Sequence, residues 1–467
     1  MPRTRVLVVT GAAIGARMAG PAIRATAIAR VLADDGHHVT LATTAALDAD
    51  AMDQAWADRK PVRLARLRPG DRRAYAALER VSDVIVFQGH MMEQFPRLAR
   101  TNRVVVVDAY DPLHLEMLEQ GREQPRGTWD HLVRSRVALL NQQLSRADFI
   151  LCASERQRTL YLGHLASLGR ISPATYEKDP QLAGLLAIAP FGLDPTPARH
   201  DRAALRGVAK GVDESSRIVL WGGGLYSWFD PLTLIRAVHT LAQRRPETRL
   251  VFLGTQHPGM APMGIVRESM NLARDLGALG TSVIFNGQWV PFEHRGAYYV
   301  EADAGVSTHH AHIETEFSFR TRILDYIWAG LPMVVTEGDS FADLVSEKQW
   351  GVVVPAEDEA ALEAALERVL YDEQFAADCK ARIEAVRDEF SWEHTLEPLR
   401  EFVANPRQAA DVIRAGKRTT LARSLRSAKT TPLPVGFRRD VRMAAHYLRH
   451  GGINELRARI AMRRAQR

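Results

Sequence analysis

The stretch RIVLWGGGLYSWFDP, residues 217–231, places a β-rich run directly before three glycines. The run ends at Trp221, and a helix start is expected near Pro231. Because glycine has no Cβ, a glycine loop after a strand lets backbone N–H groups approach a phosphate-bearing ligand closely. We therefore expect Gly223 and Gly224 to contact a ligand, with a purely structural turn as the alternative.

The same alternation of a β-rich run and a helical stretch extends along most of the chain. The runs are RVLVVTG, HVTLAT, DVIVFQG, RVVVVDAY and FILCAS in the first half, and RIVLWGGG, RLVFLGT, SVIFNG, AGVSTH and PMVVTEG in the second. This alternation predicts parallel sheets covered by helices. A stretch rich in Pro, Gly and charge separates the two series. The sequence therefore predicts two Rossmann-like α/β domains, residues 1–195 and 215–390, joined by a linker at 196–214.

Length and composition fit an ordinary globular protein. The chain has 467 residues, 46% of them hydrophobic, which suggests about two or three domains. Cys152 and Cys379 are far apart, so neither a disulfide framework nor a zinc site is indicated. No signal peptide and no run of eighteen apolar residues is visible. We expect a cytoplasmic protein without a metal or other cofactor.

Positive charge is concentrated in a C-terminal tail, residues 406–467. From Arg407 to Arg467 there are 16 Lys or Arg against 3 Asp or Glu, and apolar residues recur at helical spacing between the arginines. Such helices can lie on an anionic bilayer, which would make the protein peripheral to the membrane. The alternative is that they pack on the body or are partly disordered. Nucleic acid is not an expected partner, because aromatic residues are scarce in the tail.

A second glycine-bearing loop, TGAAIGARMAGPAIRA at residues 10–25, follows the first β-rich run. Its amides, with Gly15 as the candidate, could face a phosphate or a sugar. It is not GxGxxG, and no acidic residue follows the next strand to bind a ribose, so a nicotinamide site is not indicated. A tight turn without a ligand is the alternative.

A third loop lies in HIETEFSFRTRILDYIWAGLP, residues 312–332, which mixes charge with apolar bulk. One interpretation is a surface helix that Ser318 caps, with Arg322 and Asp325 paired at i, i+3. The other is a substrate site at a helix N-terminus. The preceding histidines, at 309, 310 and 312, are not expected to bind a metal, because successive residues of an extended segment point in alternating directions.

Together these features resemble the GT-B glycosyltransferases, particularly the large retaining family with an E-x7-E motif. The resemblance covers roughly residues 5–400 and rests on the two α/β domains, the glycine loop of the second, and a glutamate loop before a helix that ends AGLP. Four further segments are similar to parts of that family: APFGLD at 189–194, FNGQWVP at 285–291, EADAGVSTHH at 301–310 and SWEHTLEPLREFV at 391–403. The last resembles a helix that crosses back to the first domain, here residues 391–405. A GT-B fold implies two such domains facing across a cleft.

The chain departs from the family pattern in two ways. The second glutamate falls on Asp325, so the motif is E-x8-D from Glu316 or E-x10-D from Glu314. The Arg and Lys that usually follow the glycine loop and neutralise a diphosphate are missing. Arg320 and Arg322 are the nearest replacements, since a helix N-terminus alone supplies only about half a positive charge.

The resemblance implies roles for these residues toward a nucleotide-sugar donor. Glu314 or Glu316 would hold sugar hydroxyls, Asp325 would accept from the ribose hydroxyls, and backbone near Val290 would meet the base. For either glutamate a solvated loop charge is the alternative. For Asp325 it is the pair with Arg322.

The acceptor side is expected in the first domain. Asp108 follows one β-rich run and His90 its neighbour, so either could serve as a catalytic base. An aspartate after a strand is also a common cap or turn residue, and His90 could be an ordinary loop residue. The resemblance favours retention at the anomeric carbon.

The sequence thus predicts a glycosyltransferase that moves a sugar from a nucleotide-sugar donor to an envelope glycan or lipid-linked acceptor at the cytoplasmic membrane face. The alternatives are a GT-B epimerase or phosphorylase, and a non-catalytic scaffold of the same fold.

Overall fold

The computed structural model describes residues 3–15, 18–194, 196–254, 264–287, 290–291 and 294–414. The chain divides into two compact units, unit 1 (Met1–Pro190 and Leu396–Arg467) and unit 2 (Phe191–Thr395). From residue 415 onward, the predicted basic tail lies outside the described residues. None of the helices in the described ranges has the length and apolar character that crossing a membrane requires.

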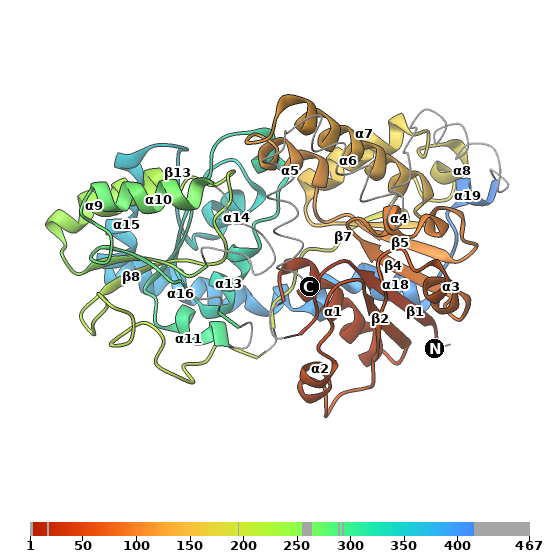
Figure 1. The fold of residues 1–467 in the computed structure, drawn as a ribbon, viewed down its shortest axis with the longest axis horizontal. Coiled ribbons are helices and arrows are strands. Elements are labelled where there is room, and N and C mark those ends of the chain that lie inside the picture. Colours follow the sequence, from red (N-terminus) through yellow and green to blue (C-terminus); the bar gives the residue numbers. More distant parts are fainter. Residues whose placement is uncertain are drawn as a thin grey trace, which may run out of the picture. The chain divides into compact units, whose positions relative to one another are not determined.

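Unit 1 contains, within the described residues, a seven-stranded parallel sheet in the order β3-β2-β1-β4-β5-β6-β7. Its central strands are unbroken apolar runs, which is typical of parallel strands covered on both faces. In Figure 1, α6 and α7 lie on one side of this sheet and α1 on the other. The strands are β1 (Arg5–Thr10), β2 (His38–Thr43), β3 (Arg63–Arg66), β4 (Val84–Gln88), β5 (Val104–Asp108), β6 (Phe149–Cys152) and β7 (Leu186–Ile188).

The helices of unit 1 begin where the sequence supplies caps or a proline. Asp71 caps α3, Ser154 caps α7, and α1 carries Pro21 in its first turn. The helical elements are α1 (Gly20–Asp34), α2 (Ala49–Ala55), α3 (Arg72–Arg80), α4 (Met91–Gln94), η1 (Pro96–Arg100), α5 (Leu113–Gln120), α6 (Arg126–Arg146), α7 (Glu155–Ser167), α8 (Pro173–Tyr176), α18 (Glu397–Ala404) and α19 (Ala410–Arg414).

Unit 2 contains, in its described part, a six-stranded parallel sheet in the order β10-β9-β8-β11-β12-β13. Its strands are β8 (Arg217–Trp221), β9 (Thr248–Phe252), β10 (Val283–Phe285), β11 (Ala304–Ser307), β12 (Met333–Thr336) and β13 (Gly351–Val354). Its helical elements are α9 (Pro231–Arg244), α10 (Gly264–Asp275), α11 (Arg295–Val300), α12 (Ile313–Phe317), α13 (Thr321–Ala329), α14 (Ser340–Lys348), α15 (Glu359–Tyr371), α16 (Glu373–Val386), η3 (Arg387–Phe390) and α17 (Trp392–Thr395). The predicted fold class of two parallel-sheet α/β units is confirmed.

Each sheet has a point where the strand order reverses, between β1 and β4 in unit 1 and between β8 and β11 in unit 2. Open parallel sheets bind ligands at the carboxyl ends of the strands on either side of such a point. The loops after β1, β4 and β5 in unit 1, and after β8 and β11 in unit 2, are therefore the places to look for a site.

The segment 391–405, expected as one returning helix, is divided between the units. Trp392–Thr395 belongs to unit 2, and Glu397–Ala404 belongs to unit 1. In unit 1, Phe402 stacks on Phe149 with ring centroids 4.3 Å apart, and the Thr4 hydroxyl donates to the Val403 carbonyl. The segment Glu397–Ala404 is therefore attached to the sheet of unit 1 by both packing and hydrogen bonding.

The segment 196–214, expected as a linker, lies within unit 2, where the carboxylate of Glu301 holds it. This carboxylate accepts three consecutive backbone N–H groups, of residues 204–206, at 2.6–2.8 Å, and lies 2.7 Å from His200 Nε2. Burial raises the pKa of Glu301, but the backbone bonds and His200 outweigh it, and the pKa falls below its ordinary value.

We expect Glu301→Gln to destabilise the protein by about 1.5–3 kcal/mol, because an amide N–H₂ group would replace an acceptor of charged hydrogen bonds. Urea unfolding at neutral pH measures the loss, with the exposed Glu214→Gln as a control that should change little. Since the folded pKa of Glu301 is lowered, its contribution is present at neutral pH and is lost as the pH falls through that pKa. A difference between wild type and variant that stays constant into acid would contradict this account.

Candidate functional site

The backbone angles and close neighbours of the loop after β8 explain why its three residues are glycines. Gly223 has φ +82°, which favours glycine, and a Cβ there would meet nothing within 4 Å. A Cβ on Gly222 would lie 2.4 Å from the Tyr299 hydroxyl, and one on Gly224 would lie 3.0 Å from the ring of Tyr226. Close packing against Tyr299 and Tyr226 therefore explains glycine at positions 222 and 224. The space beside Gly223 is open in the described part of the unit.

Arg322 of α13 contacts this loop. Its Nη2 donates to the Gly224 carbonyl at 3.0 Å, and its guanidinium lies over the rings of Trp221 and Phe229, 4.3 and 4.0 Å from their centroids. Burial lowers the pKa of Arg322 to about 10, so the side chain stays charged at neutral pH. Its Nη1 is buried and has no hydrogen-bond partner among the described residues. A charged group with an unused donor thus sits at the glycine loop.

Arg320 is placed differently. Its Nη1 and Nη2 donate to the two carboxylate oxygens of Glu314 at 3.1 and 2.7 Å, and Nη2 also reaches the Thr315 hydroxyl. Arg320 and Glu314 are both buried, whereas Glu316 is exposed. The pair holds the loop after β11 against the start of α13, so Arg320 already has a carboxylate partner.

The interpretation of residues 312–332 as a helix that Ser318 caps is wrong. α13 begins at Thr321 after Arg320, which makes no side-chain cap, and the Ser318 hydroxyl donates back to the Thr315 carbonyl in α12. α13 ends at Ala329, and Gly330, with a φ of +70°, caps its C-terminus.

Asp325 does not pair with Arg322, so that alternative is also wrong. Its two oxygens accept from Arg295 Nε at 3.3 Å and from the Tyr299 hydroxyl at 3.1 Å, and its side chain is 30% exposed. Tyr299 also abuts Gly222, so the carboxylate and the glycine loop belong to one cluster. Val290 is half-buried in the short described stretch 290–291.

The histidines that precede α12 serve separate elements. His309 lies buried with Nε2 3.4 Å from Asp339, His310 lies 3.1 Å from Glu357, and His312 caps α12. Among the residues that the structure describes, no group of three or more His, Cys, Asp or Glu side chains could hold a metal ion.

In unit 1, Asp108 is the partner of a buried arginine. Both of its oxygens accept from Arg24 of α1 at 2.8–2.9 Å, and neither side chain is exposed. Arg24 also donates to the carbonyls of Ala189 and Pro190. Asp108 is therefore neither a helix cap nor a free carboxylate.

The structure also explains why position 15 is a glycine. Its φ is +140°, and a Cβ there would lie 2.6 Å from that of Asp48, the cap of α2. The neighbouring backbones are joined by the bridge between Ile14 and Leu47.

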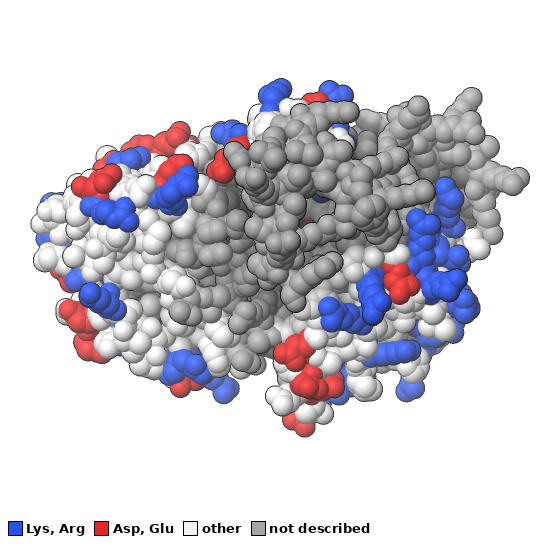
Figure 2. Space-filling view, viewed as in Figure 1, with Lys and Arg blue, Asp and Glu red and all other residues white. Residues whose placement is uncertain are grey.

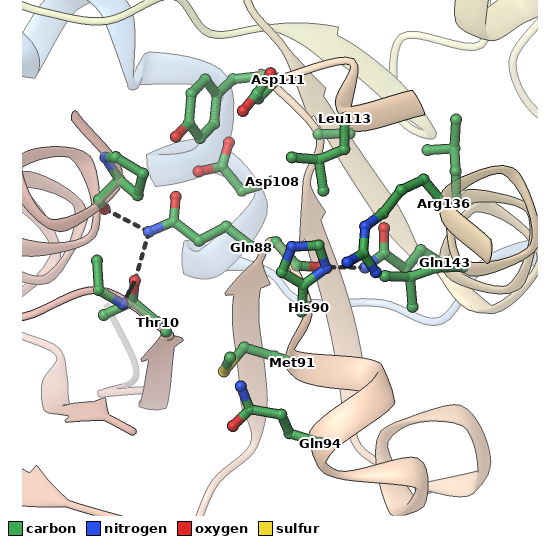
Figure 3. A pocket seen from close by; sticks show the side chains of 18 residues that line it. Thr10, Gln88, His90, Met91, Gln94, Asp108, Asp111, Leu113, Arg136 and Gln143 are labelled. Atoms are coloured by element: carbon green, nitrogen blue, oxygen red, sulfur yellow. Dashed lines mark hydrogen bonds between the residues drawn. The ribbon is translucent and has the colours of Figure 1, made fainter. Parts of the chain in front are cut away.

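A pocket of about 260 Å³ opens at the reversal point of the first sheet (Figure 3). It is lined from the ends of β1, β4 and β5 and from α4 and α6, and it includes Thr10, Gln88, His90, Met91, Asp108, Arg136 and Gln143. Burial, and then the nearby Arg136, lower the pKa of His90 to about 4, so the imidazole is neutral.

The structure brings Gly224, Arg322 and Asp325 together in unit 2, and His90 and Asp108 together in unit 1. Sequence reasoning missed Arg24, Gln88, Arg136, Arg295 and Tyr299. Only Gln88 carried a signal, as a polar residue at the end of the apolar run VIVFQ.

Comparisons with known proteins agree with this arrangement. Residues 216–372 match the family model described as Glycosyl transferases group 1. A search of curated proteins finds no match in sequence.

Three solved structures are similar over most of the chain. A sucrose-phosphate synthase from Thermosynechococcus elongatus is 16% identical, with a TM-score of 0.60 over 89% of this chain and 100% of that one. Anabaena HepE, in complex with UDP and glucose, is 17% identical, with a TM-score of 0.60 over 86% and 100%. WaaG, a glycosyltransferase involved in lipopolysaccharide biosynthesis, is 17% identical, with a TM-score of 0.55 over 88% and 100%. The chain therefore has the GT-B fold, and residues 216–372, in its second unit, are those that match the group 1 glycosyltransferases.

Proposed function

We propose that the chain is a glycosyltransferase whose unit 2 holds a nucleotide-sugar donor. One observation carries the proposal: Arg322, buried yet charged, reaches the glycine loop and keeps an unused N–H group there. The match of residues 216–372 and the UDP bound by the structurally similar HepE support it. Screening UDP-, GDP- and ADP-sugars for release of the nucleoside diphosphate, with and without membrane lipid, tests it.

Charge development in the reaction explains why such an arginine is useful. Cleavage between an anomeric carbon and a nucleoside diphosphate builds negative charge on the phosphates, and donors already in place stabilise that charge without reorganising. In this proposal the amides near Gly223 and the free N–H of Arg322 face the diphosphate. Asp325 accepts from the ribose and the exposed Glu316 from sugar hydroxyls, while Arg320 acts through Glu314 to hold their loop.

Retention at the anomeric carbon is part of the proposal. An inverting reaction needs a base to take the acceptor proton, and a base works best when its pKa is near the operating pH. Asp108 is engaged by Arg24, and His90 has a pKa of about 4. Neither suits that role, which favours the retaining route.

We further propose an envelope glycan or lipid-linked acceptor at the cytoplasmic membrane face. Besides the tail, the segment 63–80 of unit 1 carries six exposed arginines without an ion pair among the described residues: Arg63, Arg66, Arg68, Arg72, Arg73 and Arg80. Figure 2 shows Lys and Arg side chains gathering where Figure 1 draws α3. Two of them occupy the first turn of α3, where the helix dipole disfavours positive charge. The stability of the helix therefore does not explain these arginines, whereas a role in binding does.

The rival functions predict different products. An epimerase or phosphorylase of the same fold would rearrange or phosphorolyse the sugar without an elaborate acceptor, and a scaffold would turn over no donor. Product analysis after incubation with the accepted donor separates the three.

Asp325→Asn should weaken binding of the nucleoside diphosphate about tenfold or more, because a charged hydrogen bond to the ribose is worth about 1.5–3 kcal/mol. Calorimetry with UDP, GDP and ADP measures it. Arg295→Met is the matched control, since it breaks the pair with Asp325 and leaves the carboxylate. Unchanged affinity in Asp325→Asn would make this residue a mere partner of Arg295.

Arg322→Met should lower affinity for the nucleoside diphosphate about tenfold or more and leave affinity for the bare nucleoside unchanged, because the lost charge faces only the phosphates. Methionine keeps apolar contact with Trp221 and Phe229. Arg320→Met should instead reduce stability by stranding Glu314. Equal losses for nucleoside and diphosphate in side-by-side titrations would count against the diphosphate role.

Deletion of residues 415–467 should greatly reduce sedimentation with vesicles containing anionic lipid. The deletion removes 14 Lys or Arg and 2 Asp or Glu, and basic residues near such a surface contribute about 1 kcal/mol each. It spares α19, where Asp411 pairs with Arg170. Binding should also weaken with salt. Binding unaffected by the deletion or by salt would refute the membrane proposal for the tail.

A further inference from the structure

The pocket of unit 1 contains several buried polar atoms that the described residues leave without a partner. They are Gln88 Oε1, His90 Nδ1, Gln94 Oε1 and Arg136 Nε, and all four residues line the pocket. A buried polar atom without a hydrogen bond is costly, so a cluster around one cavity calls for a ligand that bonds to it.

The hydrogen bonds of Gln88 show whether its unpartnered atom donates or accepts. Its amide nitrogen donates to the Thr10 hydroxyl at 3.0 Å and to the Pro21 carbonyl, as the dashed lines in Figure 3 show. Because the Pro21 carbonyl can only accept, the amide cannot be turned around. Oε1 is therefore an acceptor, and the register places Gln88 beside Asp108 at the carboxyl ends of β4 and β5.

His90 adds a second acceptor. It stands directly after β4 and before α4, in neutral form, and a neutral imidazole always offers one nitrogen that accepts. Gln94 follows one helical turn later, so its side chain comes from the same face of α4. The unpartnered groups therefore include two acceptors with a settled role, Gln88 Oε1 and a His90 nitrogen.

The charges around the pocket disfavour an anion as its natural occupant, although Arg136 Nε is an unpartnered donor there. Asp108 is paired with Arg24, and Arg136 has Glu93 3.4 Å from its Nη1. A phosphate or carboxylate would set its oxygens against the acceptors of Gln88 and His90. Part of the wall is apolar, from Met91, Leu113, Leu139 and Leu140, and Asp111 places a further carboxylate in the lining.

We propose that this pocket binds a neutral, hydroxyl-rich ring, a sugar unit of the acceptor, whose hydroxyls donate to Gln88 Oε1 and His90 and whose apolar face packs on Met91 and Leu139. The assignment to the acceptor rests on the proposed function. The chemistry of the ligand rests on the pocket alone.

The test uses the full chain and methyl glycosides of glucose, galactose and mannose, with glucose 6-phosphate and glucuronic acid as anionic probes. Ligand-observed NMR should detect at least one neutral glycoside, bound more tightly than either anion. Gln88→Leu should weaken that glycoside about fivefold or more, and Leu139→Trp, which fills the cavity, should abolish its binding. Gln181→Leu, an exposed change outside the pocket, is the control, and thermal melting checks that each variant folds.

Titration of the same proteins with UDP, GDP and ADP separates the two proposals. Loss of glycoside binding with unchanged nucleotide affinity supports the pocket. Nucleotide binding without any glycoside binding, tighter binding of an anionic sugar, or full glycoside binding in folded Leu139→Trp would overturn it and leave the proposed function standing. Glycoside binding without nucleotide binding or turnover would keep the pocket as a sugar site and overturn the proposed function.

Discussion

Removing a guanidinium from water is costly unless its charge is compensated and its N–H groups are bonded, and this cost organises the loops at both reversal points. Arg24 ties α1 to the end of β5 through Asp108, and to the end of the first segment of unit 1 through the carbonyls of Ala189 and Pro190. Arg320 ties the loop after β11 to the start of α13 through Glu314. Arg322 ties α13 to the glycine loop. Removing one partner of a buried ion pair costs about 3–5 kcal/mol, so the ion pairs of Arg24 and Arg320 hold their loops in place.

The arginines of α13 differ in how completely they are satisfied, and that difference separates architecture from chemistry. Arg320 has a carboxylate that matches its charge in a two-point contact, so a further anion would have to compete with Glu314. Arg322 has only a carbonyl and two aromatic faces, which compensate a positive charge weakly. From the sequence alone, the two arginines were equally good candidates for contact with a diphosphate. Their burial and partners favour Arg322.

Local patterns predicted the fold, whereas contacts over long sequence distances were invisible to them. The strands that sequence analysis missed, β3, β7 and β13, are all sheet edges, where short segments are less buried than the central runs. The segment 196–214 has the composition of a linker, but a carboxylate about 100 residues away, on Glu301, fixes it to unit 2. Asp325 likewise found its partner 30 residues away in Arg295 rather than at i, i+3, because Arg322 turns toward Trp221 and Phe229. Periodicity records which face of an element is apolar, and it carries no information about which distant charge that face will meet.

The two candidate sites differ in the hydrogen-bonding groups that they leave unused. At the glycine loop of unit 2 the unused group is a donor, Arg322 Nη1, whereas the pocket of unit 1 leaves acceptors unused on Gln88 and His90, together with one donor, Arg136 Nε. Glycosyl transfer needs both kinds of site, since a departing diphosphate gains negative charge and must be met by donors, while an acceptor sugar is neutral and presents hydroxyls that must be met by acceptors. A pocket that bound anions in unit 1 would compete for the donor's phosphates. In the proposed function, the neutralisation of Asp108 by Arg24 and the neutrality of His90 thus have a common consequence: they would keep the pocket of unit 1 selective for an uncharged, hydroxyl-bearing partner and leave the phosphates to unit 2.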